Sequence, residues 1–380
     1  MRRGRCLLWA GVLCAALTGC SAPMALSYTH DIETTVLIRT LAVDVGTQSL
    51  DGVGVTASSG LRPSVGSAPS QEPVVLSAQA DTVSAARATM QTYGENELFF
   101  GNVEQMLVGE GLAQRGVDDF LTLMTRDFEL RLDAQLWVVR GSSAADVLMD
   151  AQEGGGTDER LEAMEDDIKL SDTTLPRSGR EALMDLRRNG ATFLPALRKV
   201  PSRPGDGGKG EATILTAGYA LLRDGALCSW TTPEESHGIN LLLSQLDNEP
   251  VELTTPDSVK MAVNITQAQT SFTPRVDEKQ TLVGLGVDCQ IEARISEIRG
   301  GGLPQGEELD WLEAELAQRC QARIEEALGH AQALETDFFN LGRRAVMKRP
   351  WQKQAVERQW QDAFPTLEIT VNVEAQVVRG

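Results

Sequence analysis

The segment VGLGVDCQIEARI, Val283 to Ile295, has an apolar or small side chain at every odd position, with polar residues or glycine between them. Successive side chains of a strand point to opposite faces, so this period of two predicts a strand with one buried and one solvated face. Two other segments alternate in the same way: Val259 to Ile265, and Leu367 to Val377. Together they predict a mixed or antiparallel sheet that needs an apolar cover on one side.

A long helix can supply that cover. Apolar residues recur at intervals of three and four along one stretch: Leu309, Leu312, Leu316, Cys320, Ile324 and Leu328. This spacing places them on one stripe of a helix from about residue 307 to residue 334, and Glu, Gln and Arg occupy its other faces. We therefore expect a C-terminal α+β domain in which a long helix lies on the sheet.

The segment PSRPGDGGKG, residues 201–210, is the best candidate for a linker because it has little apolar surface and several glycines. It lacks the glycine spacing and the Ser or Thr after lysine that a phosphate-binding loop requires. We predict a domain boundary here, with an N-terminal domain at 20–200 and a C-terminal domain at 211–380. The strands 212–222 and 226–230, joined by a tight turn at Gly225, would open the second domain as a hairpin.

The first half alternates between strand and helix patterns. Strands are expected at 33–46, with 53–56 as a hairpin partner, at 74–78 and at 130–140. Helices are expected at 81–90, 110–127 and 179–189, together with a short helix capped by Ser142 or Ser143, and Pro195 is expected to end the region. This order predicts a layered α/β or α+β domain that could itself divide into two subdomains. The expected fold class is α+β and multi-domain, with each sheet covered by helices.

The N-terminus has the layout of a secretory signal: Arg2, Arg3 and Arg5, then an apolar run from Cys6 to Ala16. The run is shorter than the roughly 20 residues of a membrane-spanning helix. The following Leu-Thr-Gly-Cys20 resembles the bacterial lipobox, in which the cysteine is acylated and becomes the new N-terminus. We predict a signal peptide at 1–19 and a lipoprotein held in a membrane by diacylglyceryl and palmitate chains on Cys20.

The chain is strongly acidic, with 54 Asp and Glu against 35 Lys and Arg and a net charge of −19. Loss of residues 1–19 removes three arginines and no acid, so the mature chain is more acidic still. Phosphate backbones and anionic headgroups repel such a surface. The composition therefore argues against nucleic-acid partners and against electrostatic membrane binding, which leaves the lipid to provide the anchor.

Several blocks resemble the Ger(x)C lipoproteins, the C subunits of nutrient receptors in bacterial endospores. The first is Ala-Val-Asp-Val-Gly at 42–46, after the lipobox. The second is FFGNVEQMLVGEGLAQRGVDDFLTLMTRDFELRLDAQLWVVRG at 99–141, in which Gly101-Asn102 stands where members often have Gly-His. The third is Asp337-Phe-Phe-Asn-Leu-Gly342 followed by Pro350-Trp351, Phe364 and the last alternating strand. The resemblance covers nearly the whole mature chain.

This resemblance implies a lipid-anchored subunit on the outer face of the inner spore membrane, beside membrane-embedded A and B subunits of the germinant receptor. It implies a role in triggering germination by small nutrients. It implies no reaction, so we expect no enzymatic activity and no cofactor.

The residues themselves show no pattern of catalytic or metal-binding groups. His30, His237 and His330 are widely separated, and we interpret them as solvated or hydrogen-bonded surface residues. Cys228, Cys289 and Cys320 are too widely spaced for a zinc site, and the last two continue apolar stripes. Arg343, Arg344, Lys348 and Arg349 form a basic cluster that could cap a helix, face phospholipid or meet an acidic partner. Trp351 and Trp360 beside it could be core or interface.

Two other functions share features with this sequence. A substrate-binding lipoprotein of a membrane transporter would also carry a lipobox, but it usually has repeated βαβ units in both lobes. A secreted hydrolase would need a nucleophile or metal constellation, for which the sequence has no motif such as G-x-S-x-G or H-E-x-x-H.

Overall fold

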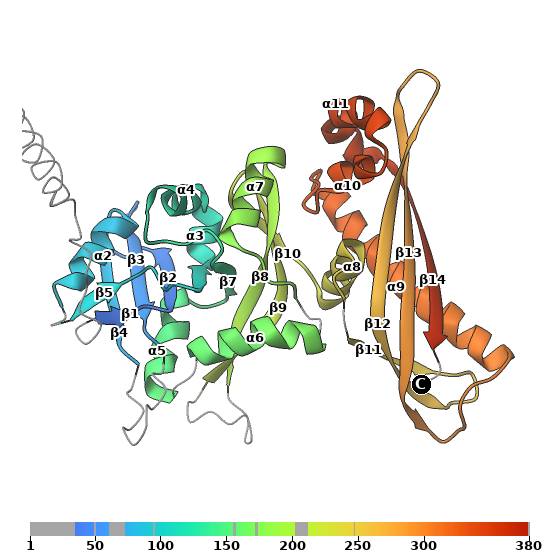
Figure 1. Cartoon of the computed structure of the whole chain (residues 1–380), viewed down its shortest axis with the longest axis horizontal. Helices are drawn as coiled ribbons and strands as arrows, with labels where there is room; N and C mark the ends of the chain where they lie inside the picture. Colours follow the sequence, from blue (N-terminus) through green and yellow to red (C-terminus); the bar gives the residue numbers. More distant parts are fainter. Residues whose placement is uncertain are drawn as a thin grey trace, which may run out of the picture.

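The computed structural model describes residues 35–48, 51–60, 73–93, 96–154, 157–171, 174–201, 212–246 and 248–378. Within these residues the strands form three sheets (Figure 1). A small parallel pair consists of β1 (Thr35–Leu37) and β5 (Glu97–Phe99). The other two sheets have eight and four strands, so the expected α+β fold with several helix-covered sheets is confirmed.

The eight-stranded sheet has the order β10–β9–β8–β7–β6–β2–β3–β4. Its strands are β2 (Thr40–Val45), β3 (Val53–Ser58), β4 (Val75–Ala80), β6 (Gln105–Gly109), β7 (Gln135–Arg140), β8 (Ala191–Pro201), β9 (Ala212–Arg223) and β10 (Ala226–Trp230). The central strands β8, β7, β6 and β2 run parallel to one another, and the strands outside them pair antiparallel. Central strands of this kind are apolar on both sides, as LWVV at 136–139 illustrates, because helices cover both faces.

Four helices pack on one face of this sheet: α2 (Val83–Gln91), α3 (Glu110–Arg115), α4 (Asp118–Arg126) and α7 (Gly179–Asn189). The other face contacts α5 (Ala144–Gly154) and α6 (Thr157–Ser171), whose Leu148 and Leu161 are fully buried. Trp137 and Phe193 point to this second face and belong to the larger of the two apolar cores.

The C-terminal sheet has the order β11–β12–β13–β14, with strands β11 (Glu249–Thr254), β12 (Lys260–Val276), β13 (Leu282–Arg299) and β14 (Glu368–Val378). The pairs β11–β12 and β12–β13 are antiparallel, and β14 is parallel to β13. Helix α9 (Glu307–Ala333) lies along one face (Figure 1) and buries the predicted stripe, including Leu312, Leu316 and Cys320. Both the alternation and the covering helix are therefore confirmed.

A group of short helices follows α9: α10 (Leu341–Met347), η3 (Pro350–Gln352), α11 (Lys353–Ala363) and η4 (Phe364–Thr366). They lie beside the tip of the β12–β13 hairpin, where Gln359 Nε2 donates to the carbonyl of Gln280 at 2.8 Å (Figure 1). Helix α8 (Pro233–Leu243) packs between the eight-stranded sheet and α9.

The segment expected as a linker does not separate the two large sheets. Strands β8 and β9 pair antiparallel from Ala191 with Arg223 to Pro201 with Ala212, so the residues between them connect neighbouring strands of one sheet. The hairpin β9–β10 forms as predicted, but it completes the first sheet instead of opening the second. In space, the first sheet ends after β10, and α8 leads into the second.

Pro195 does not end the region, contrary to expectation, but lies inside β8. Proline has no backbone N–H to donate to a sheet ladder and is therefore usually found at strand edges or bulges. The register between β8 and β9 shifts between Pro195 and Leu197, which accommodates the missing donor.

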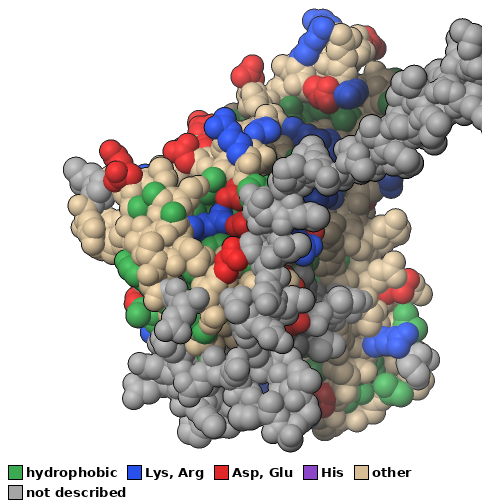
Figure 2. Space-filling view, turned by 60° about the vertical axis from the view of Figure 1, so that its left-hand side comes forward, with side chains coloured by type: hydrophobic (Ala, Val, Ile, Leu, Met, Phe, Trp, Pro, Cys, Tyr) green, Lys and Arg blue, Asp and Glu red, His purple; other side chains and the backbone are tan. Residues whose placement is uncertain are grey.

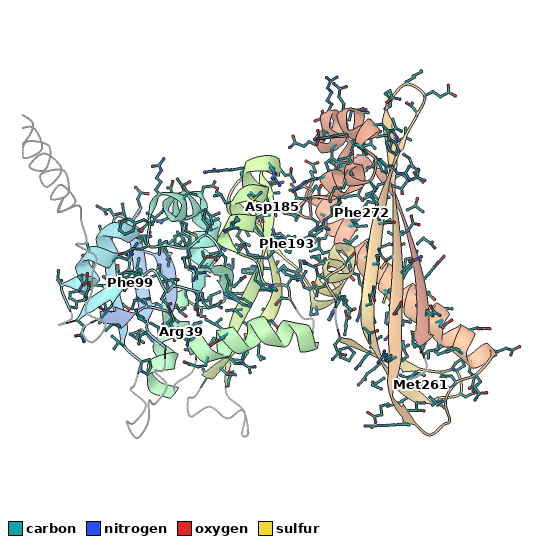
Figure 3. All side chains as sticks on the ribbon, viewed as in Figure 1. Arg39, Phe99, Asp185, Phe193, Met261 and Phe272 are labelled. Carbon is teal, nitrogen blue, oxygen red and sulfur yellow. The ribbon has the colours of Figure 1, made fainter. Side chains whose placement is uncertain are left out.

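The larger core runs through both halves of the molecule. It contains Phe193 and Tyr219 from the first sheet and Phe272 from β12, and Figure 3 labels Phe193 and Phe272 on the two sides of the junction between the halves. The rings of Phe193 and Phe339 pack edge to face with centroids 5.7 Å apart. The two halves are therefore joined by apolar packing.

Candidate functional site

The predicted lipidation site Cys20 lies outside the described residues, as do His30 and residues 202–210 of the expected linker. Acylation of Cys20 stays a prediction. Among the helices in the described ranges, none has both the length and the apolar composition needed to cross a bilayer.

One half-buried carboxylate joins two of the sequence blocks noted above to the start of α5. Asp44, at the end of β2, accepts hydrogen bonds from the backbone amides of Ala144 and Ala145, each at 2.9 Å. These amides begin α5, so Asp44 caps that helix across the sheet. A Cβ on Gly109 would lie 1.8 Å from Asp44 Oδ1, which explains the glycine at the end of β6. Burial raises the pKa of Asp44 above its usual value, and the two amides oppose that shift.

A second buried carboxylate organises the C-terminal helices. Asp337 accepts hydrogen bonds from the amides of Phe339, Leu341 and Gly342, and from Trp360 Nε1 at 2.8 Å. It therefore caps α10 and ties α11 to it. Burial raises the pKa of Asp337, whereas the four donors favour its charged form. The Asp-Phe-Phe-Asn-Leu-Gly segment is thus a structural junction.

Two histidines join elements at the centre of the molecule. His237 Nδ1 lies 3.1 Å from Glu249 Oε1, a carboxylate that also pairs with Arg323 at 2.5 Å. His330 lies between Ser229 and Glu235: its Nε2 is 3.0 Å from the Ser229 hydroxyl, and its Nδ1 is 2.9 Å from Glu235 Oε1. Both rings are partnered and about four-fifths buried.

The Ser229, His330 and Glu235 side chains are aligned in the order of a nucleophile, a base and an acid, which the spacing in the sequence did not indicate. The hydrogen-bond geometry at His330 Nδ1 is poor, however, since this buried atom has no well-directed partner. Glu235 also accepts the Thr232 amide at 2.6 Å through its other oxygen, as part of a capping box on α8. The arrangement links β10, α8 and α9.

In the part of the chain that the structure describes, the cysteines and acidic groups form no recognisable metal site. Cys289 and Cys320 are buried, as their positions on apolar stripes predicted, and burial raises the pKa of Cys320 to about 12. Cys228 is exposed on β10. Within the described ranges, no three His, Cys, Asp or Glu side chains are grouped closely enough to hold a metal ion.

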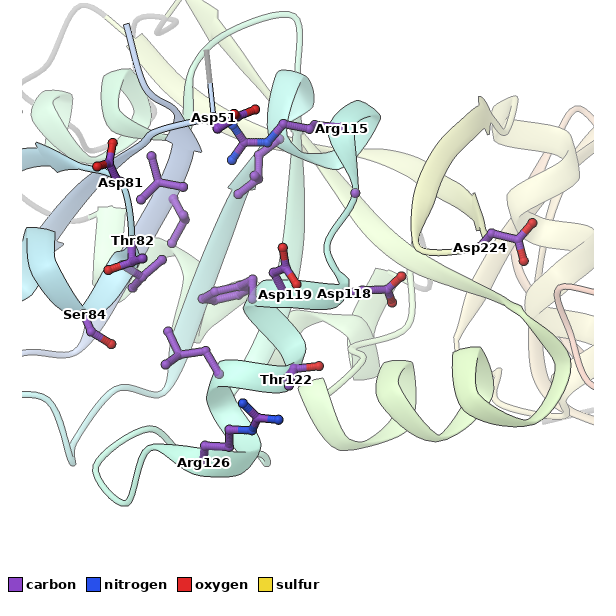
Figure 4. A pocket seen from close by; sticks show the side chains of 17 residues that line it. Asp51, Asp81, Thr82, Ser84, Arg115, Asp118, Asp119, Thr122, Arg126 and Asp224 are labelled. Carbon is purple, nitrogen blue, oxygen red and sulfur yellow. The ribbon is translucent and has the colours of Figure 1, made fainter. Parts of the chain in front are cut away.

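An open cleft of about 800 Å³ lies between α2, the ends of β2 and β3, and the α3–α4 segment. Figure 4 shows Asp81, Thr82 and Ser84 on one side, and Asp119, Thr122 and Arg126 on the other. Its floor is apolar, with Val43, Val53, Leu112, Phe120 and Leu123. Arg115 Nη1 donates to the carbonyl of Gly52 at 2.9 Å at one end. The walls carry carboxylate, hydroxyl and guanidinium groups, so the cleft suits a polar molecule better than an apolar one.

The structure separates the members of the basic cluster. Arg344 Nε donates to the carbonyl of Phe339 at 3.3 Å, and Arg349 donates to Thr273 at 3.4 Å, whereas Arg343 and Lys348 are exposed. Of the two tryptophans, Trp360 is buried against Phe364 and bonded to Asp337. Trp351 is 73% exposed, so one tryptophan belongs to the core and the other to the surface.

Comparisons with known proteins agree with this architecture. Residues 28–199 match the family described as "Spore germination protein N-terminal domain", and residues 217–380 match "Spore germination B3/ GerAC like, C-terminal". The chain belongs to the GerC-like family of spore germination proteins. The two matches lie on either side of the segment predicted as a linker, although strands β8 and β9 pair across it.

Individual relatives of this GerC-like protein are distant. The putative spore germination protein YfkR of Bacillus subtilis (strain 168) is 21% identical over 313 residues, which cover 80% of this chain and 78% of YfkR. The crystal structure of the GerBC protein has the same fold, with a TM-score of 0.57 at 16% identity, over 89% of this chain and 96% of GerBC. The GerC-like family belongs to germinant receptors and is consistent with membrane association.

Sequence reasoning identified the Asp44 and Asp337 blocks in this GerC-like chain as family signatures but assigned them no role. Each aspartate is followed within a few residues by a glycine, Gly46 after Asp44 and Gly342 after Asp337. An aspartate close to a glycine is typical of a turn or cap and is the available sequence signal here. The partners of Asp44 are 100 residues away in the chain, so their identity depends on the tertiary fold.

Proposed function

We propose that the protein is a lipid-anchored, non-enzymatic subunit of a spore germinant receptor complex and takes part in triggering germination. The observation that carries this proposal is the match of both halves of the chain to spore germination families. The lipobox at Cys20 supports attachment by acyl chains, and two or more chains anchor a protein stably where one binds only marginally.

The proposed partners are the membrane-embedded A and B subunits of the receptor, and the proposed location is the outer face of the inner spore membrane. A secreted chain whose described helices include no membrane span would reach such partners from outside the bilayer. The two buried aspartate junctions hold the body together and leave its surface for contacts. Protein contacts are therefore the proposed mode of action.

The test is germination of spores that carry Cys20→Ala. We expect the substituted protein to leave the membrane fraction and the response to nutrients to fall to that of spores lacking the gene. Cys228→Ala is the matched control, because Cys228 is an exposed cysteine without a lipobox and should be replaceable. Normal germination with Cys20→Ala protein still in the membrane fraction would refute the proposal.

Hydrolysis is the one alternative that a specific geometric observation favours, namely the alignment of Ser229, His330 and Glu235. A serine activated in this way reacts with fluorophosphonates. The subunit proposal predicts no labelling of Ser229 in the purified protein, and labelling that His330→Ala abolishes would establish the hydrolase instead. The transporter alternative is less suited to the fold, since the C-terminal sheet has one long helix on one face and no repeated βαβ unit.

A further inference from the structure

The positive charge of this acidic protein is unevenly distributed. The whole chain has 35 Lys and Arg against 54 Asp and Glu, yet residues 343–353, RRAVMKRPWQK, contain five cations and no acid. This segment forms α10, η3 and the start of α11, at one end of the C-terminal sheet (Figure 1).

The fold places a second basic segment next to it. Helix α7 ends with the exposed Arg187 and Arg188, and the adjoining Asn189 donates a hydrogen bond to Asn340 at the start of α10. Figure 1 shows α7, α10 and α11 toward the same end of the molecule, and Figure 2 shows Lys and Arg side chains gathered near that end. We call this surface the basic end, and its exposed cations are Arg187, Arg188, Arg343, Lys348 and Lys353.

Large apolar side chains project among these cations. Trp351 is 73% exposed and Met347 is 69% exposed, while Met184 on α7 is 40% exposed. These are isolated side chains on short helices, whereas a site for a partner helix would present a continuous apolar stripe. Tryptophan is favoured at membrane–water interfaces because its ring is apolar and its N–H can remain hydrated.

Buried side chains beneath the basic end fix its helices to the rest of the C-terminal half. Asp337 joins α10 to Trp360 on α11, and Arg349 donates to Thr273 on β12. Burial lowers the pKa of Arg344, and the nearby positive charges of Arg177 and Arg343 lower it further. The effect of these two neighbours shows that positive charge is concentrated here. Two nearby acids are paired, Asp185 with Arg177 and Glu357 with Lys353 at 3.8 Å, whereas Asp362 on α11 is exposed.

We propose that the basic end rests on an anionic phospholipid surface, with Trp351 and Met347 at the level of the headgroups. Each Lys or Arg close to such a surface strengthens binding about fivefold. The acidic remainder of the chain is repelled by the same surface, so the charge asymmetry sets one orientation of the body. This contact does not require Cys20. It orients the body of the protein on the membrane, independently of how the chain is attached.

The test uses the full mature chain, reconstituted into vesicles of phosphatidylcholine with or without phosphatidylglycerol, whose acyl chains carry bromine to quench tryptophan fluorescence. We expect quenching in the anionic vesicles that Trp351→Phe removes. The double substitution Lys348→Glu and Lys353→Glu keeps Trp351 and should weaken the contact by about 25-fold or more. High salt should act in the same direction as this substitution.

The matched control is Lys260→Glu with Arg294→Glu, which makes the same charge change on the C-terminal sheet away from the basic end. It should leave the quenching unchanged. Equal quenching of the parent and the Lys348/Lys353 variant would overturn the proposal, as would equal quenching in neutral vesicles. The Lys348/Lys353 variant could instead lose an acidic protein that co-purifies with the parent, with no change in quenching. That result would also overturn the proposal and would assign the basic end to that protein. Co-sedimentation with vesicles reports attachment separately, so a failed lipid anchor is distinguishable.

Discussion

Gly342 shows how a single residue determines the arrangement of the C-terminal helices. A Cβ at this position would lie 2.5 Å from the Trp360 ring, and that ring is bonded to the carboxylate of Asp337. The close approach of the indole to the backbone therefore requires glycine. The same dependence applies to Gly109 beside Asp44.

We predict that Gly342→Ala destabilises the protein by about 1–3 kcal/mol, because the Trp360 ring must shift in a packed core. Thermal or urea unfolding measures this change. Gly329→Ala is the control, since nothing lies within 4 Å of the added methyl and Gly329 is exposed within α9. Removal of a helix glycine should stabilise by about 0.5–1 kcal/mol. Similar effects for the two substitutions would contradict the account of Gly342.

At the scale of the elements, strand alternation and helix periodicity predicted most of the described structure. The helical segment predicted at 110–127 forms two short helices, α3 and α4, and the helix predicted at 179–189 is confirmed as α7. Helix α6 was not predicted, because its sequence is acidic and follows a run of glycines. The cap of α2 is Thr82, whose hydroxyl accepts a hydrogen bond from the Ala85 amide, so the helix begins two residues later than the predicted start at 81.

The tip of the β12–β13 hairpin provides an element-scale prediction. Gln280 has a positive φ of 64°, a conformation that costs an ordinary residue about 1 kcal/mol and glycine little. Asp277 Oδ1 already accepts the amides of Lys279 and Thr281, so the turn keeps its shape after substitution. Gln280→Gly should therefore stabilise the hairpin by up to about 1 kcal/mol.

Hydrogen exchange of the Asp277 amide, which donates to the carbonyl of Thr281 at 3.0 Å across the end of the hairpin, measures this effect. Lys279→Gly is the matched control, because φ at Lys279 is not positive and glycine there should only add disorder to the unfolded chain. Faster exchange in Gln280→Gly than in the parent would refute the prediction.

At the scale of the whole molecule, the pairing of β9 with β8 determines which fragments can fold. A fragment of residues 28–200 lacks β9 and β10, so β8 becomes an open edge and loses the packing of Tyr219 and Leu221. A fragment of residues 28–232 keeps the complete sheet. We predict that the longer fragment is the more soluble and the better protected from hydrogen exchange, since exposed strand edges promote aggregation.

Solubility and amide exchange of the two fragments, compared with the full chain, test this prediction. Equal protection of β6 and β7 in both fragments would show that β9 and β10 are dispensable and would restore the boundary at 201–210. Both fragments should be less stable than the full chain, because the core that contains Phe193 continues into the C-terminal half.

Net charge is another whole-molecule property that the local structure qualifies. The acidic composition argued against electrostatic membrane binding, but charge acts over roughly 10 Å at moderate salt. A cluster such as Arg343, Lys348 and Lys353 can therefore attract anionic lipid while the body as a whole repels it. Because the basic end is positive and the rest of the body is negative, the protein takes one orientation on an anionic surface.

The sequence alone determined the properties that depend on neighbours along the chain. These are the alternating strands of the C-terminal sheet, the apolar stripe of α9, the burial of Cys289 and Cys320, and the family. The lipobox at Cys20, on which the predicted acylation rests, is also a local signal. The spacing of apolar residues along a strand or helix indicates which of its faces is apolar. It does not indicate which other element packs on that face.

The tertiary structure decided which distant segments meet. It assigned β9 and β10 to the first sheet, brought Asp44 to the start of α5, and placed Asn189 at the end of α7 against Asn340 at the start of α10. It also separated Trp351 from Trp360, which are only nine positions apart. These outcomes depend on how sheets and helices pack over long sequence distances, and local periodicity contains no information about which surfaces come together.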